Sequence, residues 1–208
     1  MKENNWFDPF YIQSHLNEEE SNIQKNVRDF CNNELKPTVV ERNRKNEFDQ
    51  SLYPKFGSLG VLGQTVKTHG GSGTSNLAYG LVAYEFEKID SSYRSSISVQ
   101  SSLVIHPINE FGSQEQKDKY LPPLIKGEKI GCFGLTESEA GSDPASMKTS
   151  FKKTKDGYIL NGSKNWITNA PIADIFIIWA IEENKDHKSI KGFIIEKNTE
   201  GLNTSTIE

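Results

Sequence analysis

Two short segments hold the residues whose types and spacing suggest chemistry. The first, residues 132–144, reads Cys-Phe-Gly-Leu-Thr-Glu-Ser-Glu-Ala-Gly-Ser-Asp-Pro, and the second, residues 166–169, reads Trp-Ile-Thr-Asn. Small residues allow a backbone to come close to a flat, charged ligand. The hydroxyls of Thr136 and Ser142 suit ring and phosphate atoms, and an indole has a wide apolar face that can cover an aromatic ring. Together the segments indicate a site for an aromatic ligand that carries phosphate.

Each residue taken alone has a simpler interpretation. The glycines and the threonine of residues 134–142 are also typical of turns that close a β-hairpin. A single tryptophan more often packs in a core or an interface, Thr168 alone is typical of a strand, and Arg94 alone is typical of a helix end or surface. The functional interpretation therefore depends on several segments agreeing in order and spacing.

That order and spacing resemble the acyl-CoA dehydrogenase family, from about Phe7 to the end of the chain. Besides the two segments above, the resemblance rests on Gly-Val-Leu-Gly at 60–63, Gly-Ser-Gln-Glu-Gln-Lys at 112–117 and Lys-Tyr-Leu-Pro at 119–122. Within the family, Asp-Ser-Ser-Tyr-Arg-Ser-Ser-Ile-Ser-Val-Gln-Ser-Ser-Leu-Val at 90–104, followed by His-Pro-Ile at 106–108, is similar to glutaryl-CoA dehydrogenases.

The resemblance implies FAD as the cofactor. The first segment should line the pyrimidine side of the isoalloxazine through its backbone and the Thr136 hydroxyl, while Gly141 and Ser142 should lie near the pyrophosphate and the incoming CoA ester. Residues 133–136 are Phe133, Gly134, Leu135 and Thr136.

The second segment is expected at the reactive part of the ring. By resemblance, Trp166 should stack on the flavin edge and Thr168 should hydrogen-bond near N5, the hydride acceptor. Asn169 and Ala170 should continue this contact.

The resemblance also implies a binding site for glutaryl-CoA or a related acyl-CoA. Arg94 should pair with the distal carboxylate, Glu87 should hold Arg94, and Ser95, Ser98 and Ser142 should add polar contacts. A carboxylate in a partly dry cleft is costly unless it is paired, and a guanidinium offers it two parallel donors. Glu87 and Arg94 are seven residues apart and a bend is expected between them, so the sequence leaves open whether they touch.

In the intact protein we expect oxidation of glutaryl-CoA with loss of CO₂ to give crotonyl-CoA, through α-proton abstraction and β-hydride transfer to flavin N5. The family's glutamate base belongs to a C-terminal helical domain that we expect beyond residue 208, and neither Glu137 nor Glu139 matches it. We therefore expect a fragment, with electron-transfer flavoprotein as acceptor and a homotetramer when complete. Two alternatives stay open, a general short-chain acyl-CoA dehydrogenase and a non-catalytic remnant that binds FAD or a partner.

The elements that must position these residues change character near residue 128. Helical spacing and capping residues predict helices after Asn17, over 51–59, 76–89 and 92–105, and from Ser113 to Tyr120, before Pro122 and Pro123. Strands are expected at 129–135, 149–154, 158–161, 175–181 and 190–195. The predicted class is α+β, with a helical bundle domain over 1–127 and a partial, β-barrel-like middle domain over 128–208.

The composition excludes several classes of protein. A net charge of −4 over 208 residues, with no basic block, argues against nucleic acid. Cys31 and Cys132 lack metal spacing and are expected to be reduced thiols. The longest apolar stretch, 175–181, is too short to span a membrane, and no leader segment is evident. By resemblance we expect the cytoplasm of a bacterium or the mitochondrial matrix of a eukaryote.

Overall fold

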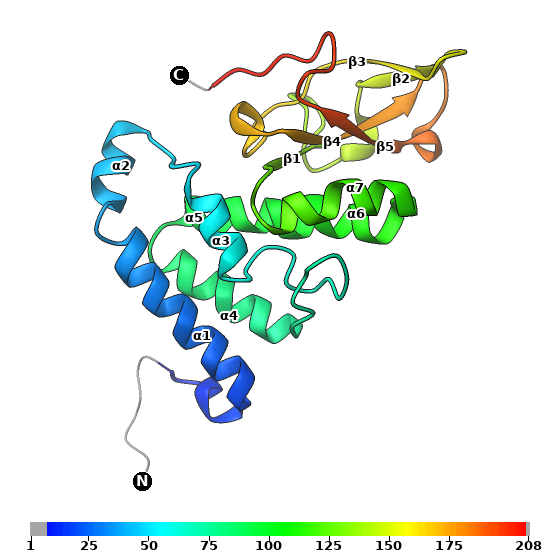
Figure 1. The fold of residues 1–208 in the computed structure, drawn as a ribbon. Helices are drawn as coiled ribbons and strands as arrows, with labels where there is room; N and C mark the ends of the chain where they lie inside the picture. Colours follow the sequence, from blue (N-terminus) through cyan, green and yellow to red (C-terminus); the bar gives the residue numbers. More distant parts are fainter. Residues whose placement is uncertain (1–7, 207–208) are drawn as a thin grey trace.

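The computed structural model describes residues 8–206. A group of helices lies on one side of a sheet, and α6 and α7 run along the sheet with α1 and α4 farther from it (Figure 1). The start of the resemblance at Phe7 and the expectation about a leader lie outside the described residues. Within residues 8–206, no helix combines the length and apolar character needed to cross a bilayer.

Seven α-helices carry the first part of the described chain; α1, α3, α4, α5 and α7 lie where helices were predicted, whereas α2 and α6 were not predicted. Their bounds are Glu18–Phe30 (α1), Val39–Lys45 (α2), Leu52–Ser58 (α3), Asn76–Glu87 (α4), Ser91–Ser98 (α5), His106–Phe111 (α6) and Gln114–Ile125 (α7). Wider π-helical turns, Cys31–Leu35 and Val99–Ile105, continue α1 and connect α5 with α6. Short 3₁₀ turns occur at Ile12–His15, Pro144–Ser146, Ala170–Ile172 and His187–Ser189.

Side chains at the helix starts show why two of these helices begin where they do. Asn17 accepts a hydrogen bond from the backbone N–H of Glu20, whose carboxylate accepts in return from the N–H of Asn17. Ser113 and Gln116 exchange the same pair of hydrogen bonds at the start of α7, so the predicted capping box is confirmed.

The predicted end of the last helix is wrong, because α7 continues through Pro122 and Pro123 to Ile125. A proline inside a helix removes a backbone donor and costs about 3 kcal/mol. Here Leu121 and Leu124 are fully buried in the helical core, and burial of each such side chain contributes about 1.5–3 kcal/mol. Tertiary packing of this last turn therefore outweighs the local preference.

A buried acid joins the two helices farthest from the sheet. Glu85 of α4 is 2% exposed, and its carboxylate accepts from Arg28 Nη2 at 2.9 Å and from Gln24 Nε2 at 3.0 Å, both on α1. Close by, the rings of Phe56 and Phe86 pack edge to face with centroids 5.4 Å apart. The helical part is thus held by the contacts of buried Glu85 with α1 as well as by aromatic packing.

The second part of the chain forms an open five-stranded sheet, which confirms the α+β class. The strands are Gly131–Gly134 (β1), Ser150–Lys153 (β2), Tyr158–Asn161 (β3), Ile175–Glu182 (β4) and Lys191–Glu196 (β5). β4 pairs in parallel with β1 and β2 and antiparallel with β5, and β3 pairs antiparallel with β2. All five lie where strands were predicted.

Alternation along β4 separates the two faces of this sheet. Ile175 and Ile177 belong to the same buried cluster as the helices, whereas Phe176 packs with Cys132 on the opposite face. Both cysteines are free and buried, and burial raises the pKa of each thiol to about 12. One face of the sheet is therefore fixed against the helices, which sets where the loops at the strand ends lie.

Candidate functional site

The structure brings the two chemical segments together side by side. The backbone N–H of Asn165 donates to the carbonyl of Thr136 at 2.9 Å. Lys164 Nζ donates to the carbonyl of Leu135 at 3.0 Å and to Glu137 Oε1 at 2.7 Å. Residues on both sides of Thr136 are thereby tied to the residues just before Trp166. The predicted juxtaposition of Thr136 and Trp166 follows from these bonds.

The ion pair at the centre of this contact is buried, with side-chain exposures of 7% for Lys164 and 9% for Glu137. Glu137 also accepts from the backbone N–H groups of Lys148 and Thr149, at 2.7 and 3.0 Å. Burial alone would raise the pKa of Glu137, but the hydrogen bonds from Lys164, Thr149 and these N–H groups lower it to about 2. Such a carboxylate is a structural anchor and a very weak base.

The neighbouring Glu139 is exposed and forms an ion pair with Lys148. The hydrogen bond and the charge of Lys148 lower the pKa of Glu139 below its usual value. Neither acid of this loop has the raised pKa that suits a general base near neutral pH. The geometry thus agrees with the expectation that the loop does not supply the base.

Two glycines of the first segment differ in the space that surrounds them. A Cβ at Gly134 would lie 2.5 Å from the Cδ1 atom of Ile178, so the close approach of β1 to β4 excludes a side chain there. A Cβ at Gly141 would meet no atom within 4 Å. The chain itself leaves the space beside Gly141 open, which fits the approach of a ligand to this backbone.

The outer surface of the two segments carries the groups that a flat, phosphate-bearing ligand requires. Trp166 is 72% exposed and adopts a left-handed backbone conformation with φ of 60°. Thr168 and Ser142 are exposed as well. An exposed indole and hydroxyl donors beside an open glycine backbone suit the ring and the phosphates of a dinucleotide. The residues present therefore fit FAD.

Other side chains of the predicted set point inward. Phe133 packs against the helical core and against Trp179, with ring centroids 5.9 Å apart. Asn169 has a left-handed φ of 70°, and its Nδ2 donates to the carbonyl of Gly131 at 3.2 Å. Ala170 begins the 3₁₀ turn that follows. Phe133 would thus meet a ligand through its backbone, as the resemblance implies.

The predicted substrate residues gather around the junction between α4 and α5. Arg94 Nε donates to Glu87 Oε2 at 2.7 Å, and Ser91 Oγ donates to Glu87 Oε1 at 2.6 Å. Both hydrogen bonds lower the pKa of Glu87, and the one from Ser91 has the larger effect. The contact that the sequence left open therefore exists. Within residues 8–206, no hydrogen bond engages the two terminal nitrogens of Arg94.

A small cavity adjoins this arginine. It is lined by side chains of α4 and α5 and of the loop before α4, namely Gln64, Tyr79, Val82, Ala83, Phe86, Arg94, Ile97 and Ser98. The hydroxyl of Tyr79 lies 2.6 Å from Ser102 Oγ and donates to Ser98 Oγ at 3.4 Å. Ser95 is half-buried on the same helix. Arg94 and Ser98 thus line the same small, partly polar cavity.

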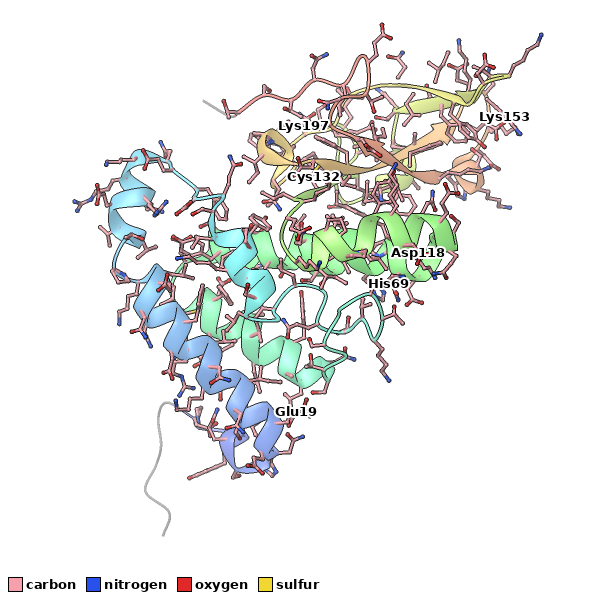
Figure 2. All side chains as sticks on the ribbon, viewed as in Figure 1. Glu19, His69, Asp118, Cys132, Lys153 and Lys197 are labelled. Atoms are coloured by element: carbon pink, nitrogen blue, oxygen red, sulfur yellow. The ribbon has the colours of Figure 1, made fainter. Side chains whose placement is uncertain are left out.

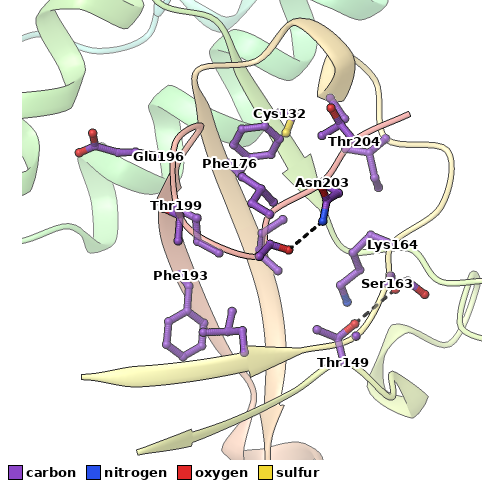
Figure 3. Close-up of a pocket in the computed structure, with 18 of the residues that line it drawn as sticks. Cys132, Thr149, Ser163, Lys164, Phe176, Phe193, Glu196, Thr199, Asn203 and Thr204 are labelled. Atoms are coloured by element: carbon purple, nitrogen blue, oxygen red, sulfur yellow. Dashed lines mark hydrogen bonds between the residues drawn. The ribbon is translucent and has the colours of Figure 1, made fainter. Parts of the chain in front are cut away.

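A larger cleft, of about 1580 Å³, lies on the sheet face opposite the helices. Phe176 and Phe193 line it from the sheet, and an extended segment that includes Thr199, Asn203 and Thr204 runs across it (Figure 3). Within residues 8–206, Trp166 and Ala170 are the predicted cofactor residues that line this cleft. The other predicted residues lie outside it, so volume alone does not identify the candidate site.

Comparison with known proteins decides the family. The chain matches the model of the acyl-CoA dehydrogenase N-terminal domain over residues 17–128 and that of the acyl-CoA dehydrogenase middle domain over residues 132–208. The chain belongs to the acyl-CoA dehydrogenase family. The predicted family is confirmed, and acyl-CoA dehydrogenases are FAD-dependent oxidoreductases.

Relatives of this family member carry several substrate names. A short-chain-specific enzyme of Clostridium acetobutylicum is 39% identical over 195 residues, 93% of this chain and 52% of that protein. Mitochondrial isovaleryl-CoA dehydrogenase of Pongo abelii is 39% identical over 196 residues, 91% of this chain and 46% of that protein. These similarities leave the acyl group open.

A solved structure supports both the fold and the cofactor. The crystal structure of a glutaryl-CoA dehydrogenase from Mycobacterium smegmatis in complex with FADH2 gives a TM-score of 0.91 at 40% identity, covering 96% of this chain and 50% of that one. The chain thus spans about half the length of the acyl-CoA dehydrogenases that it matches.

Several residues that organise the site were not found from the sequence. Lys164 lies between the two motifs and carries no motif of its own, and Gln100 lies in a serine-rich stretch, between Val99 and Ser101. Gln100 is fully buried and receives the N–H of Gly131 at 2.7 Å, while its own Nε2 donates to the carbonyls of Leu124 and Lys129. Because buried amides need hydrogen-bond partners, the role of Gln100 becomes visible only once its burial is known.

Proposed function

We propose that this chain contributes the FAD-binding face and the acyl pocket of an enzyme that oxidises glutaryl-CoA. The proposal includes domains at 1–127 and 128–208, and the cofactor residues expected by resemblance. The observation that supports the substrate is Arg94, which Glu87 holds through Nε while its terminal nitrogens carry no hydrogen bond within residues 8–206. A guanidinium oriented in this way suits the distal carboxylate of a dicarboxylic acyl group.

The residues have distinct parts in this proposal. Bound FAD would supply the hydride acceptor. The segment around Thr136 and the hydroxyl of Thr168 would hold the ring, Trp166 would cover its edge, and Gly141 and Ser142 would leave room for the phosphates and the CoA ester. Arg94, with Ser95 and Ser98, would fix the far end of the acyl chain and so orient the reacting carbons.

Proton abstraction is assigned to a glutamate outside these 208 residues. The two acids of the loop, Glu137 and Glu139, are bound to Lys164 and Lys148, and Glu87 is bound to Arg94. We further propose electron-transfer flavoprotein as the acceptor, a homotetramer as the assembly and a cytoplasmic or mitochondrial location. Each of these rests on the family resemblance and concerns the whole protein.

The test compares two substrates with the whole protein. Under the proposal, kcat/KM is higher for glutaryl-CoA than for butyryl-CoA, and crotonyl-CoA and CO₂ form from the former. Reduction of bound FAD by butyryl-CoA alone would favour the second candidate, a short-chain acyl-CoA dehydrogenase, which the similarity to the Clostridium acetobutylicum enzyme supports. A purified protein without flavin, and without affinity for added FAD, would favour the non-catalytic alternative.

A further inference from the structure

We propose that Tyr53, Ser96 and Asn169 are positioning residues that hold the turn 166–169 against the acyl-pocket helix α5. The proposal rests on the proposed function in one respect, that this turn faces the flavin. It assigns the Asn169 side chain to the protein interior, where it sets the positions of Trp166 and Thr168. Tyr53 and Ser96 do not belong to the residues predicted to bind cofactor or substrate.

The three side chains form one chain of hydrogen bonds with a defined direction. The hydroxyl of Tyr53 lies 2.5 Å from Ser96 Oγ, and Ser96 Oγ donates to Asn169 Oδ1 at 3.4 Å. Because the single hydroxyl proton of Ser96 goes to Asn169, Tyr53 must be the donor in the first bond. Asn169 Nδ2 then donates to the carbonyl of Gly131 at 3.2 Å.

Burial keeps these hydrogen-bonded side chains away from water and in one protonation state. Tyr53 is 0% exposed and Ser96 is 2% exposed. Burial of Tyr53 raises the pKa of its hydroxyl to about 12, so the donor remains protonated throughout the neutral range. A buried hydroxyl that loses its acceptor carries a free-energy penalty, so each member favours the native position of the next.

These hydrogen bonds connect the segments that must be aligned to form the proposed site. Tyr53 lies on α3, Ser96 lies two residues beyond Arg94 on α5, and Asn169 ends the turn that contains Trp166 and Thr168. Gly131 opens the strand that leads to Thr136. A single path thus links the acyl-pocket helix to both flavin segments.

The backbone of Gly131 shows how closely the strand is held. Its carbonyl accepts from Asn169, and its N–H donates to Gln100 Oε1 at 2.7 Å. A Cβ at this position would lie 2.5 Å from Val104 Cγ1, so the strand touches the helix directly. Side-chain amides from two sides therefore satisfy backbone groups that the pairing with β4 does not use.

The test measures the turn itself, without relying on activity. Hydrogen–deuterium exchange is recorded for Tyr53→Phe, which removes one hydroxyl, and for Tyr93→Phe, which removes a hydroxyl from another buried tyrosine of the helical part, outside the hydrogen-bonded chain. We expect amides of residues 166–170 to exchange about three- to tenfold faster in Tyr53→Phe than in wild type. Tyr93→Phe should leave them unchanged.

Equal acceleration in both variants, or acceleration confined to α3, would overturn the proposal, since Tyr53 would then be a packing residue. Should Tyr53→Phe not fold, Ser96→Ala replaces it with the same expectation. A parallel FAD titration separates the two levels of inference. Wild type without FAD affinity would refute the proposed function, while the exchange comparison would still decide whether these residues position the turn.

Discussion

Arg94 and Glu87 meet across the break between α4 and α5, with Arg94 Nε 2.7 Å from Glu87 Oε2. Their side chains are 38% and 45% exposed, and pairs with such exposure contribute little to stability. The pair therefore orients the guanidinium more than it stabilises the fold.

In the whole protein, Arg94→Met should lower kcat/KM for glutaryl-CoA by about 30-fold or more, because the distal carboxylate would lose its charged partner. The value for butyryl-CoA should change far less. Steady-state kinetics with both substrates measures the difference, and Arg44→Met on the exposed face of α2 is the matched control. An equal loss with both substrates would make Arg94 a structural residue.

Glu137→Gln should destabilise the chain in a pH-dependent way. The pKa of Glu137 is lowered from 4.5 to about 2, so its ionised form stabilises the folded state above pH 5, and this contribution disappears as the pH falls toward 2. At pH 7 the substitution should lower the free energy of unfolding by on the order of 2–3 kcal/mol.

Urea unfolding at pH 7 and pH 3 measures this effect. The difference between wild type and Glu137→Gln should shrink at pH 3, and the exposed Glu139→Gln should show little difference at either pH. A difference that is the same at both pH values would mean that the lowered pKa is not the source of the stabilisation.

The two glycines of the first segment should respond oppositely to alanine. Gly134→Ala introduces a methyl group 2.5 Å from Ile178 Cδ1, and such overpacking costs about 1–3 kcal/mol. Gly141→Ala meets open space, so its melting temperature should equal that of wild type while FAD or acyl-CoA affinity falls. Thermal unfolding and ligand titration decide, and unchanged affinities in Gly141→Ala would place the ligand elsewhere.

Thr168→Val keeps the shape of the side chain and removes its hydroxyl. If that hydroxyl contacts the flavin near N5, the loss should be about 1.5–3 kcal/mol, or about tenfold or more in FAD affinity or in the rate of flavin reduction. Stopped-flow bleaching of the oxidised flavin measures the rate in the whole protein. Thr154→Val, at the end of β2, is the control, and matching results for the two variants would remove Thr168 from the site.

Local signals in the sequence predicted the elements well. Asn17 and Ser113 begin helices through bonds to residues three positions later, and the apolar run of β4 is confirmed as a strand. These features depend on neighbours in the chain, so a single sequence suffices. The error at Pro122 has the opposite origin, because burial of Leu124 in the tertiary core decided the outcome.

Side-chain partners of the site were harder to predict. Ser96 and Asn169 are 73 residues apart, and Glu137 and Lys164 are 27 apart. Nothing in the type or spacing of these residues specifies a partner before the sheet has packed on the helices. The same limit applies to a glycine-rich loop at residues 69–73. There, His69 Nε2 lies 2.9 Å from Oδ1 of Asp118 on α7 (Figure 2).

The wide turn Val99–Ile105 joins α5 and α6 into one continuous helix and changes the direction in which the side chains on its two sides point. Successive residues of an α-helix are rotated by about 100°, so an added residue in a π-helical turn shifts everything beyond it by that angle. Before the turn, Arg94 and Ser98 line the small cavity, and near the end of the turn Val104 meets β1. Deleting one residue between 99 and 105 would restore a regular helix and rotate the arginine away from this cavity while the sheet contact stayed in place. If Arg94 binds the substrate as proposed, the wide turn keeps substrate recognition and sheet docking in angular register.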